Sequence, residues 1–409
     1  MSDGVHRHGK GWRFRFREAG RYRSLTFDTK RDALAARSEH RRMEQLGLLG
    51  IIEKSNMTFG ELVGHYLDSM ESRWALATTR INCSLLRIHI LPVLEKMTLG
   101  ELSRSPHILE VLDAQLAAKG LGVSSRQRAL NLQRAIFERA VRWQWMVMNP
   151  AKRVEMPRSD GTKRRPRPFT PEMIEQLRAF ALALPHTDAR TSIRDATLIS
   201  VLAYAGLRPG EALGLSWRHV GPGGILVERS AYHGTIKSTK TGRIRTVKVD
   251  EQLVQDLDRW MLASGATPDS LIFASAGGGP WTIEDWRNFH RRVFRAGCLH
   301  LGFAVEVVED RKKRWRGPNG TGNGPRPYDL RHSFVTHRLH EGYNVIETAQ
   351  MAGHRPDMTL HVYGHVLHEV DPTKDREPIS LRALNARRAL ERPNVNPRVG
   401  LQPPAARTL

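Results

Sequence analysis

Three short stretches near the C-terminal end decide how the chain is interpreted: PYDLRHSF at residues 327–334, AGHR at 352–355 and HVYGH at 361–365. Two stretches further upstream, GLRPGE at 206–211 and STKTG at 238–242, complete the set. Together they supply two arginines, a lysine, a histidine and a tyrosine. These side chains share one obvious target, a phosphodiester that is attacked by a tyrosine hydroxyl.

The residue types fit phosphoryl transfer. A guanidinium can donate two parallel hydrogen bonds to phosphate, and such fixed donors stabilise the charge that develops in the transition state. Arg208 and Arg331 are therefore candidate clamps, and His354 is a candidate third donor. Tyr363 is the candidate nucleophile. Because a free phenol has a pKa near 10, it needs a base or cationic surroundings to become a phenolate.

In this order and spacing the five stretches resemble the tyrosine recombinase (phage integrase) family. The resemblance implies a site-specific recombinase of a phage or mobile element, which cleaves and rejoins strands through a 3′-phosphotyrosyl intermediate and a Holliday junction. It implies a homotetramer on double-stranded attachment-site DNA, with no metal and no cofactor. A DNA-bending host factor or an excision factor is a candidate further partner. By the same resemblance Lys240 protonates the departing 5′ oxygen.

One position departs from the family pattern. Tyr328 stands three residues before Arg331, where the family usually has histidine. A tyrosine can donate a hydrogen bond to phosphate, but it cannot shuttle a proton near neutrality. By this hypothesis Tyr328 is an auxiliary catalytic residue that approaches a helix beginning near Asp329. For acid–base chemistry Tyr363 would then rely more on His354. His332, adjacent to Arg331 on a helix, is expected to point elsewhere and to have a structural role.

Glu211 follows Arg208 by about one helical turn and is expected to orient buried cations.

The pattern divides the chain into five segments, and the fold class is a multidomain one. Periodicity and composition predict a small β-sheet-plus-helix module at 1–55, an all-α domain at 56–156, a basic linker at 157–168, a mixed, mainly-α α+β domain at 169–385, and a disordered tail at 386–409. By the family resemblance, the first is an arm-type DNA-binding module, the second is the core-binding domain, and the fourth is a catalytic domain of the tyrosine recombinase type.

The N-terminal module alternates aromatic residues with arginines between Trp12 and Arg17, the period of a strand with one buried face. A second strand is predicted at 22–27, followed by a helix from Asp28. Arginines on one sheet face suit a DNA groove, although a merely solvated basic face is the alternative. The candidate DNA-binding residues are Arg13, Arg15, Arg17, Arg23, and Lys163, Arg164 and Arg165 in the linker.

Three further expectations concern secondary structure. A helix in the second segment is predicted to run over 79–90 and to be closed by Pro92. Short strands are predicted at 225–227 and 244–249, with Lys240 in the turn between them. The basic, glycine-rich stretch 309–324 is expected to be a mobile loop.

Composition limits the partners. The formal net charge is +22 over 409 residues, which favours a polyanionic partner and above all nucleic acid. No apolar run approaches the length of a spanning helix, and the N-terminus does not resemble a signal peptide. The two cysteines, Cys83 and Cys298, favour reduced thiols. A cytoplasmic, nucleoid-associated protein is therefore expected.

Three alternatives remain. A type IB topoisomerase shares the arginine, lysine and tyrosine chemistry but needs no sheet module in front. A non-catalytic, sequence-specific DNA-binding protein would explain the charge but not the motif spacing. A zinc site is the third, because His361 and His365 are four residues apart, with His368 nearby, although no glutamate lies between the first two as in a His-Glu-x-x-His motif.

Overall fold

The computed structural model describes residues 4–18, 21–45, 54–158, 167–185, 188–238, 244–309, 311–369 and 377–391. The chain divides into two units, Met1–Lys163 and Arg164–Leu409, and the two large hydrophobic cores fall one in each. Lys240 and the three candidate residues of the linker, Lys163, Arg164 and Arg165, lie outside the described residues.

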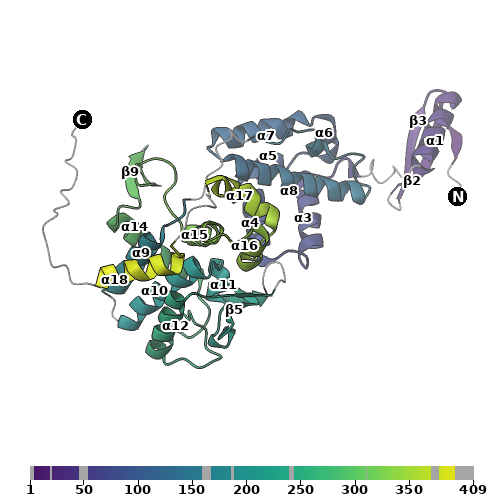
Figure 1. Ribbon diagram of the computed structural model, residues 1–409. Coiled ribbons are helices and arrows are strands. Elements are labelled where there is room, and N and C mark those ends of the chain that lie inside the picture. Colours follow the sequence, from purple (N-terminus) through teal and green to yellow (C-terminus); the bar gives the residue numbers. More distant parts are fainter. Residues whose placement is uncertain are drawn as a thin grey trace, which may run out of the picture. The chain divides into compact units, whose positions relative to one another are not determined.

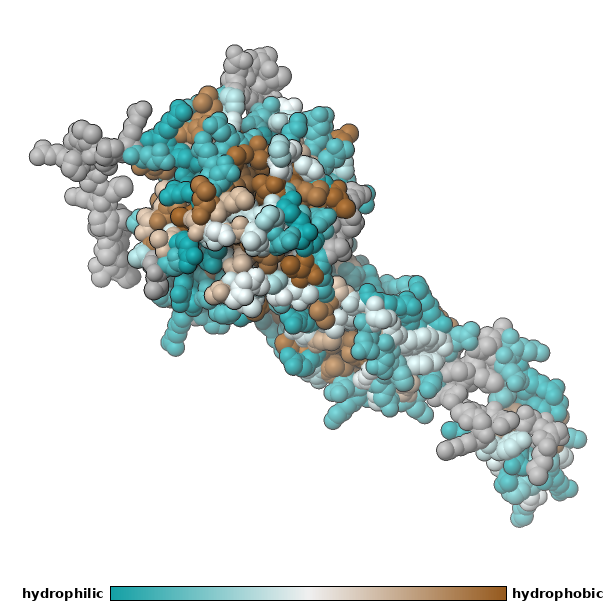
Figure 2. All heavy atoms as spheres, turned by 90° about the horizontal axis from the view of Figure 1, so that it is seen from below, coloured by the Kyte–Doolittle hydropathy of each residue, from teal (hydrophilic) through white to brown (hydrophobic). Residues whose placement is uncertain are grey.

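The first unit begins with an antiparallel sheet that packs on one helix (Figure 1). Its elements are β1 (Val5–His8), β2 (Gly11–Glu18), β3 (Arg21–Phe27) and α1 (Lys30–Gln45). Phe14 and Phe16 of β2 are buried, and because side chains alternate along a strand, Arg13 and Arg15 belong to the opposite face. The predicted order of strands followed by a helix is confirmed. Figure 2 shows mainly hydrophilic residues on the visible face of this module.

The rest of the first unit is helical. Its elements are α3 (Phe59–Met70), α4 (Leu76–Leu85), the π-helical segment η1 (Leu86–Ile90), α5 (Leu91–Leu94), α6 (Leu99–Arg104), α7 (His107–Ala118), α8 (Val123–Arg142) and the 3-10 turn η2 (Pro150–Lys152). The expectation that Pro92 closes a helix is wrong. Pro92 lies in the first turn of α5, where its missing N–H and fixed φ are tolerated, and the chain stays helical to Leu94.

The second unit mixes helices with short strands. Its helices are α9 (Pro171–Ala183), α10 (Ala189–Tyr204), α11 (Pro209–Leu213), α12 (Glu251–Ser264), α13 (Ile283–Phe289), α14 (Ala296–His300), α15 (Pro327–His340), α16 (Val345–Ala352), α17 (Pro356–Glu369) and α18 (Ile379–Glu391), with the 3-10 turn η3 (Trp217–His219) and the π-helical segment η4 (His290–Arg295). Its strands are β4 (Val220–Gly221), β5 (Gly224–Val227), β6 (Arg229–Tyr232), β7 (Thr235–Ser238), β8 (Arg245–Val247), β9 (Val305–Glu309) and β10 (Lys312–Arg316), paired as β4-β5-β8, β6-β7 and β10-β9.

Helix α10 forms the centre of this unit. It packs against α9, α12 and α15, and its C-terminal half from Ala196 to Tyr204 is buried throughout. The sequence between 196 and 204 contains no charged residue, and its hydroxyl groups have buried partners: Thr197 and Ser200 donate to Asp256, and Tyr204 donates to Glu175. This composition fits a helix that is buried on all sides. Helices α15, α16 and α17 pack on one another beside it (Figure 1).

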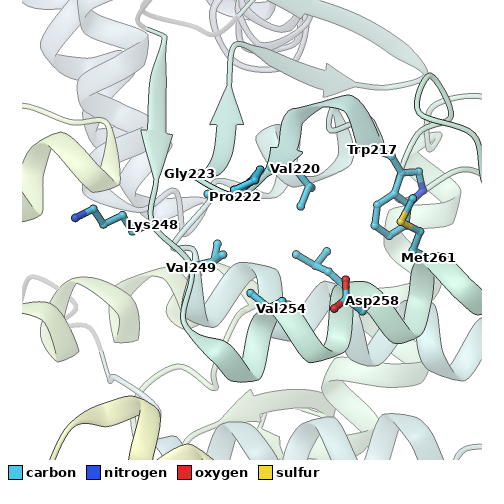
Figure 3. A pocket seen from close by; sticks show the side chains of 12 residues that line it. Trp217, Val220, Pro222, Gly223, Lys248, Val249, Val254, Asp258 and Met261 are labelled. Carbon is cyan, nitrogen blue, oxygen red and sulfur yellow. The ribbon is translucent and has the colours of Figure 1, made fainter.

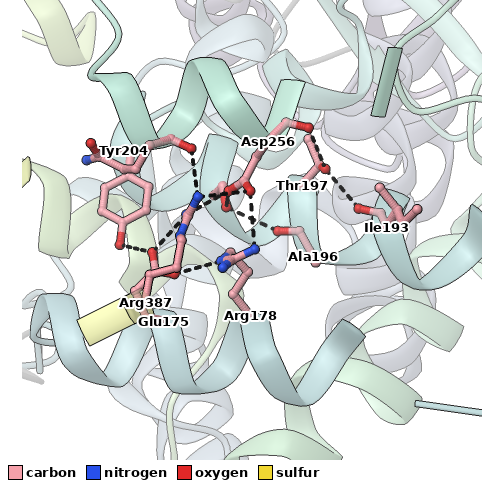
Figure 4. A network of polar contacts seen from close by, with 10 residues as sticks. Glu175, Arg178, Ile193, Ala196, Thr197, Tyr204, Asp256 and Arg387 are labelled. Atoms are coloured by element: carbon pink, nitrogen blue, oxygen red, sulfur yellow. Dashed lines mark hydrogen bonds and ion pairs between the residues drawn. The ribbon is translucent and has the colours of Figure 1, made fainter. Parts of the chain in front are cut away.

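A buried ionic network anchors α18 to the core (Figure 4). Arg387 of α18 donates to Glu175 of α9 at 2.9 Å and to Asp256 of α12 at 3.0 Å, and Arg178 joins both carboxylates. The expected disordered tail from residue 386 is therefore wrong up to Glu391, because Arg387 brings the helix two buried partners. Residues 392–409 lie outside the described part of the chain.

The first part of the stretch expected to be a mobile loop belongs to a β-hairpin, because it includes the end of β9 and all of β10. Strand β9 pairs with β10 in antiparallel register from Val305↔Arg316 to Glu309↔Lys312. Arg316 and Glu309 form an ion pair across the strands, and such cross-strand pairs stabilise a hairpin. The expectation of a loop was wrong for Lys312–Arg316, where the density of charge concealed the strand pattern.

None of the helices in the described segments combines the length and the apolar character that a bilayer crossing requires.

Candidate active site

Arg331 is held in the core by backbone carbonyls. Its Nη1 donates to the carbonyl oxygen of Gly206 at 2.5 Å, and its Nη2 donates to that of Ala352. Gly206 has φ +60°, and a Cβ there would lie 2.2 Å from the ring of Phe334, so this turn requires glycine. Burial lowers the pKa of Arg331 to about 10, which leaves it a cation at pH 7.

A second glycine positions Arg208. Gly353 ends α16 with φ +66°, and its carbonyl accepts a hydrogen bond from Arg208 Nη2 at 2.7 Å. A Cβ on Gly353 would lie 2.6 Å from the guanidinium of Arg245. The side chain of Arg208 is 30% exposed, whereas that of Arg331 is 3% exposed, so Arg208 is the more accessible of the two predicted clamps.

Glu211 joins the cations of this cluster. It accepts from Arg208 Nη1 at 2.6 Å and from Arg245 Nη2 at 2.7 Å, and it lies 4.0 Å from Arg331 Nη1. Burial alone would raise its pKa, but the hydrogen bond and charge of Arg245, with the charge of Arg208, lower the pKa of Glu211 to about 2. The expectation that Glu211 orients buried cations agrees with these contacts.

Sequence analysis missed Arg245. It lies in β8, and its Nε also donates to the carbonyl oxygen of Met351 at 2.9 Å. Its side chain is only 10% exposed. The sequence contained one indication of this role. In the strand predicted at 244–249, Arg245 lies on the same face as Val247 and Val249, and an arginine on a buried face needs an acidic partner.

His354 follows the cap of α16 and is half-buried. Its Nδ1 lies 3.2 Å from Thr359 Oγ1 and 3.3 Å from the carbonyl oxygen of Arg355, and these contacts fix the ring. Burial, together with the charge of Arg331, lowers the pKa of His354 to about 4. The imidazole is therefore neutral at pH 7.

Tyr363 is the buried phenol of the cluster. It lies on α17 and is 5% exposed. Its hydroxyl is in hydrogen-bonding contact with Nδ1 of His332 on α15, and the two ring centroids are 5.7 Å apart. Burial raises the pKa of Tyr363 above its ordinary value, and the charge of Arg331 acts in the opposite direction.

The expectation that His332 points away from the site is wrong. Adjacent residues on a helix do diverge, by about 100°, but α17 crosses α15 and brings Tyr363 to the side of α15 that carries His332. The direction in which the side chain of Arg331 points therefore does not determine whether His332 contacts the site.

Tyr328 lies in the first turn of α15, which begins at Pro327 rather than near Asp329. Its ring packs edge-on against His332 with centroids 5.2 Å apart, and it is 37% exposed. Tyr328 also borders a pocket of about 710 Å³. The basic side chains that line this pocket are Arg287, His290, Arg291, Arg295 and Arg326.

A separate pocket of about 670 Å³ lies between the turn joining β4 to β5 and helix α12 (Figure 3). Val220, Pro222, Val254 and Met261 give it a mainly apolar wall. Its lining contains none of the predicted catalytic residues.

The comparisons with known proteins agree with this geometry. The family model described as "Phage integrase family" matches residues 168–369. The tyrosine recombinase XerC of Xanthomonas axonopodis pv. citri (strain 306) is 25% identical over 262 residues, which cover 64% of this chain and 73% of that protein. The tyrosine recombinase XerD of Pseudomonas aeruginosa is 24% identical over 254 residues, which cover 61% and 73%. Residues 168–369 of the chain belong to the phage integrase family of tyrosine recombinases.

Solved structures of other tyrosine recombinases share the fold. The Tn1549 transposon integrase in complex with transposon right end DNA has a TM-score of 0.59 at 20% identity, covering 81% of this chain and all of that chain. The lambda integrase tetramer bound to a Holliday junction has a TM-score of 0.56 at 15% identity, covering 87% and 96%. The predicted family and the predicted enzyme class, a tyrosine site-specific recombinase, are confirmed.

The recombinase therefore brings four of its six predicted catalytic residues into one cluster of contacts or mutual charge effects: Arg208, Arg331, His354 and Tyr363. Tyr328 lies at the edge of this cluster, and Lys240 lies outside the described residues. The side chains of His365 and His368, weighed as zinc ligands, also lie outside the described part of the structure.

Proposed function

We propose that this recombinase is an integrase of a phage or mobile element, and that it cleaves and rejoins double-stranded DNA through a 3′-phosphotyrosyl bond to Tyr363. The observation that carries the proposal is the burial of Tyr363 within the field of Arg331, in the cluster that also holds Arg208 and His354. A cationic field favours the phenolate and binds the phosphate that it attacks.

In this proposal each residue has one task. Arg208, the more exposed arginine, binds a non-bridging oxygen of the scissile phosphate, and Arg331 stabilises the charge that develops there. His354, neutral at pH 7, donates a further hydrogen bond. Lys240 protonates the departing 5′ oxygen, which is the task of a general acid. Tyr328 acts as a neutral auxiliary donor.

The segments in front of the catalytic domain bring DNA to it. Residues 1–55 bind arm-type sites through Arg13, Arg15, Arg17 and Arg23, residues 56–156 bind the crossover site, and the basic linker 157–168 with Lys163, Arg164 and Arg165 follows the DNA backbone. Four protomers exchange strands in two rounds through a Holliday junction. Support comes from the fold shared with the lambda integrase, which was solved as a tetramer on such a junction.

The experiment starts from a pool of random-sequence duplexes. The full chain is incubated with the pool in EDTA and without ATP, SDS is added, and DNA that stays attached to protein is recovered and sequenced. We expect a shared sequence from the wild type and none from Tyr363→Phe, which should still shift the recovered duplex in a native gel. Equal recovery with Tyr363→Phe would contradict the proposal.

A second stage separates recombinase from topoisomerase. Two plasmids that carry the recovered sequence should yield joined products with the wild-type chain. Relaxation of supercoiled plasmid without joined products would favour a type IB topoisomerase activity instead.

A further inference from the structure

The chemistry of the proposed nucleophile leaves one step without a residue. Tyr363 must lose the proton of its hydroxyl as it attacks phosphorus, and burial makes that loss harder than for a free phenol. The family resemblance offers a histidine three residues before Arg331, but this chain has Tyr328 there. A phenol does not accept a proton near neutrality.

Three other groups of the cluster are poorer candidates for this proton. The carboxylate of Asp329, whose charge also acts on Tyr363, already accepts the backbone N–H of Arg326. Arg331 is a cation at pH 7 and has no acceptor atom. The Nδ1 of His354 is in contact with Thr359 and with the carbonyl oxygen of Arg355. The Nδ1 of His332, in contrast, is in direct contact with the hydroxyl of Tyr363.

We infer that His332 is a further catalytic residue, the general base that takes the proton of Tyr363. This inference rests on the proposed role of Tyr363 as nucleophile. Two observations carry it: the contact between Nδ1 of His332 and the reacting oxygen, and the edge-on packing of Tyr328 against the ring of His332 at 5.2 Å, which holds the imidazole in place. Tyr328, which stands where the family usually has histidine, thus supports the ring of His332 one helical turn further along α15.

The proton balance of the step is complete. In cleavage, the bond from Tyr363 Oη to phosphorus forms, the bond from phosphorus to the 5′ oxygen breaks, and the Oη proton moves to Nδ1 of His332. The 5′ oxygen takes a proton from the general acid, Lys240 in the proposed function. In rejoining, the 5′ hydroxyl attacks, Lys240 recovers its proton, and His332 returns its proton to the departing phenol oxygen.

The test uses the duplex recovered from the random pool, nicked so that the cleaved strand is lost, and measures the single-turnover rate of SDS-resistant adduct formation. His332→Asn keeps an acceptor oxygen close to the place of Nδ1 but does not take up the proton. We expect the rate to fall by about 100-fold or more, the contribution usual for a general base, with unchanged binding in a native gel. His340→Asn, two turns further along α15, is the matched control and should keep the wild-type rate.

Two chemical changes assign the defect to the phenol. Sulfur in place of the 5′ bridging oxygen gives a thiol leaving group, with a pKa of about 8.5, which needs no proton from an acid. This substrate should restore the rate of adduct formation in Lys240→Ala but not in His332→Asn. Replacing Tyr363 by 3,5-difluorotyrosine, a more acidic phenol, should shrink the defect of His332→Asn.

The outcomes separate the two claims. A wild-type rate for His332→Asn while Tyr363→Phe forms no adduct would overturn the role of His332 alone, and so would rescue of His332→Asn by the sulfur substrate. An adduct that persists in Tyr363→Phe would instead overturn the proposed function.

Discussion

Replacement of Glu211 by glutamine should destabilise the catalytic unit in a pH-dependent way. Glu211 is 2% exposed and pairs with Arg208 at 2.6 Å and Arg245 at 2.7 Å. Its pKa falls from 4.5 to about 2 on folding, and at about 1.36 kcal/mol per unit this difference corresponds to about 3 kcal/mol at pH 7. Glu211→Gln resembles the protonated carboxyl and loses that contribution.

The sign of the pH dependence follows from the direction of the shift. A carboxyl whose pKa is lower in the folded state stabilises the fold above its unfolded pKa, and the contribution disappears as the pH falls toward the folded pKa. The stability gap between the wild type and Glu211→Gln should therefore be about 3 kcal/mol at pH 7 and narrow to about 1 kcal/mol at pH 3.

The assay is hydrogen exchange of α10 peptides in increasing urea, which reports the unfolding free energy of the catalytic unit within the full chain. The control is Glu172→Gln. Glu172 also pairs with an arginine, Arg382, but its side chain is 45% exposed, so a loss below about 1 kcal/mol is expected. A gap below about 1 kcal/mol for Glu211→Gln at pH 7, or one that does not narrow at pH 3, would refute the reasoning.

Three further changes have defined outcomes. Arg387→Ala should release α18 and lower its protection against hydrogen exchange by about 3 kcal/mol, because Glu175 and Asp256 lose a buried cation. The control is Arg388→Ala, which changes an exposed arginine of the same helix, and equal protection in the two variants would contradict the anchoring role of Arg387. Tyr328→Phe should slow adduct formation about tenfold, the factor that about 1.4 kcal/mol represents, and a variant as inactive as Tyr363→Phe would show that Tyr328 is no auxiliary donor. Arg291→Ala, in the basic pocket, should lower the slope of log binding constant against log salt by about 1, and an unchanged slope would mean that no phosphate binds there.

The candidate catalytic positions could be selected from the sequence because single residues determine part of their local backbone geometry. Gly206 and Gly353 adopt positive φ, and their carbonyls bind Arg331 and Arg208. Gly206 lies two residues before Arg208, and Gly353 lies directly before His354, so each of these two motifs contains the glycine that its own turn requires. The motif spacing carries this information without knowledge of the tertiary fold.

Contacts between distant segments could not be predicted in the same way. Arg245 of β8 reaches Glu211 of α11, and His332 meets Tyr363 only because α17 crosses α15. Both contacts depend on how helices and strands pack against one another, and no local sequence pattern encodes this packing.

Charge also misled the interpretation. The stretch 309–324 and the tail from 386 are rich in basic residues, a composition that favours disorder. Arg316 and Arg387 nevertheless find acidic partners, one across a hairpin and one inside the core. A basic residue therefore indicates an exposed or disordered segment only where the fold supplies no acidic partner for it.

The most direct test of the central claim is to identify the residue that carries the DNA. Wild-type adduct is formed on the recovered nicked duplex, digested with nuclease and protease, and sequenced by mass spectrometry. We expect a nucleotide joined through its 3′ phosphate to the peptide that contains Tyr363. A nucleotide on Tyr328 or on any other residue, or one joined through its 5′ phosphate, would contradict the account.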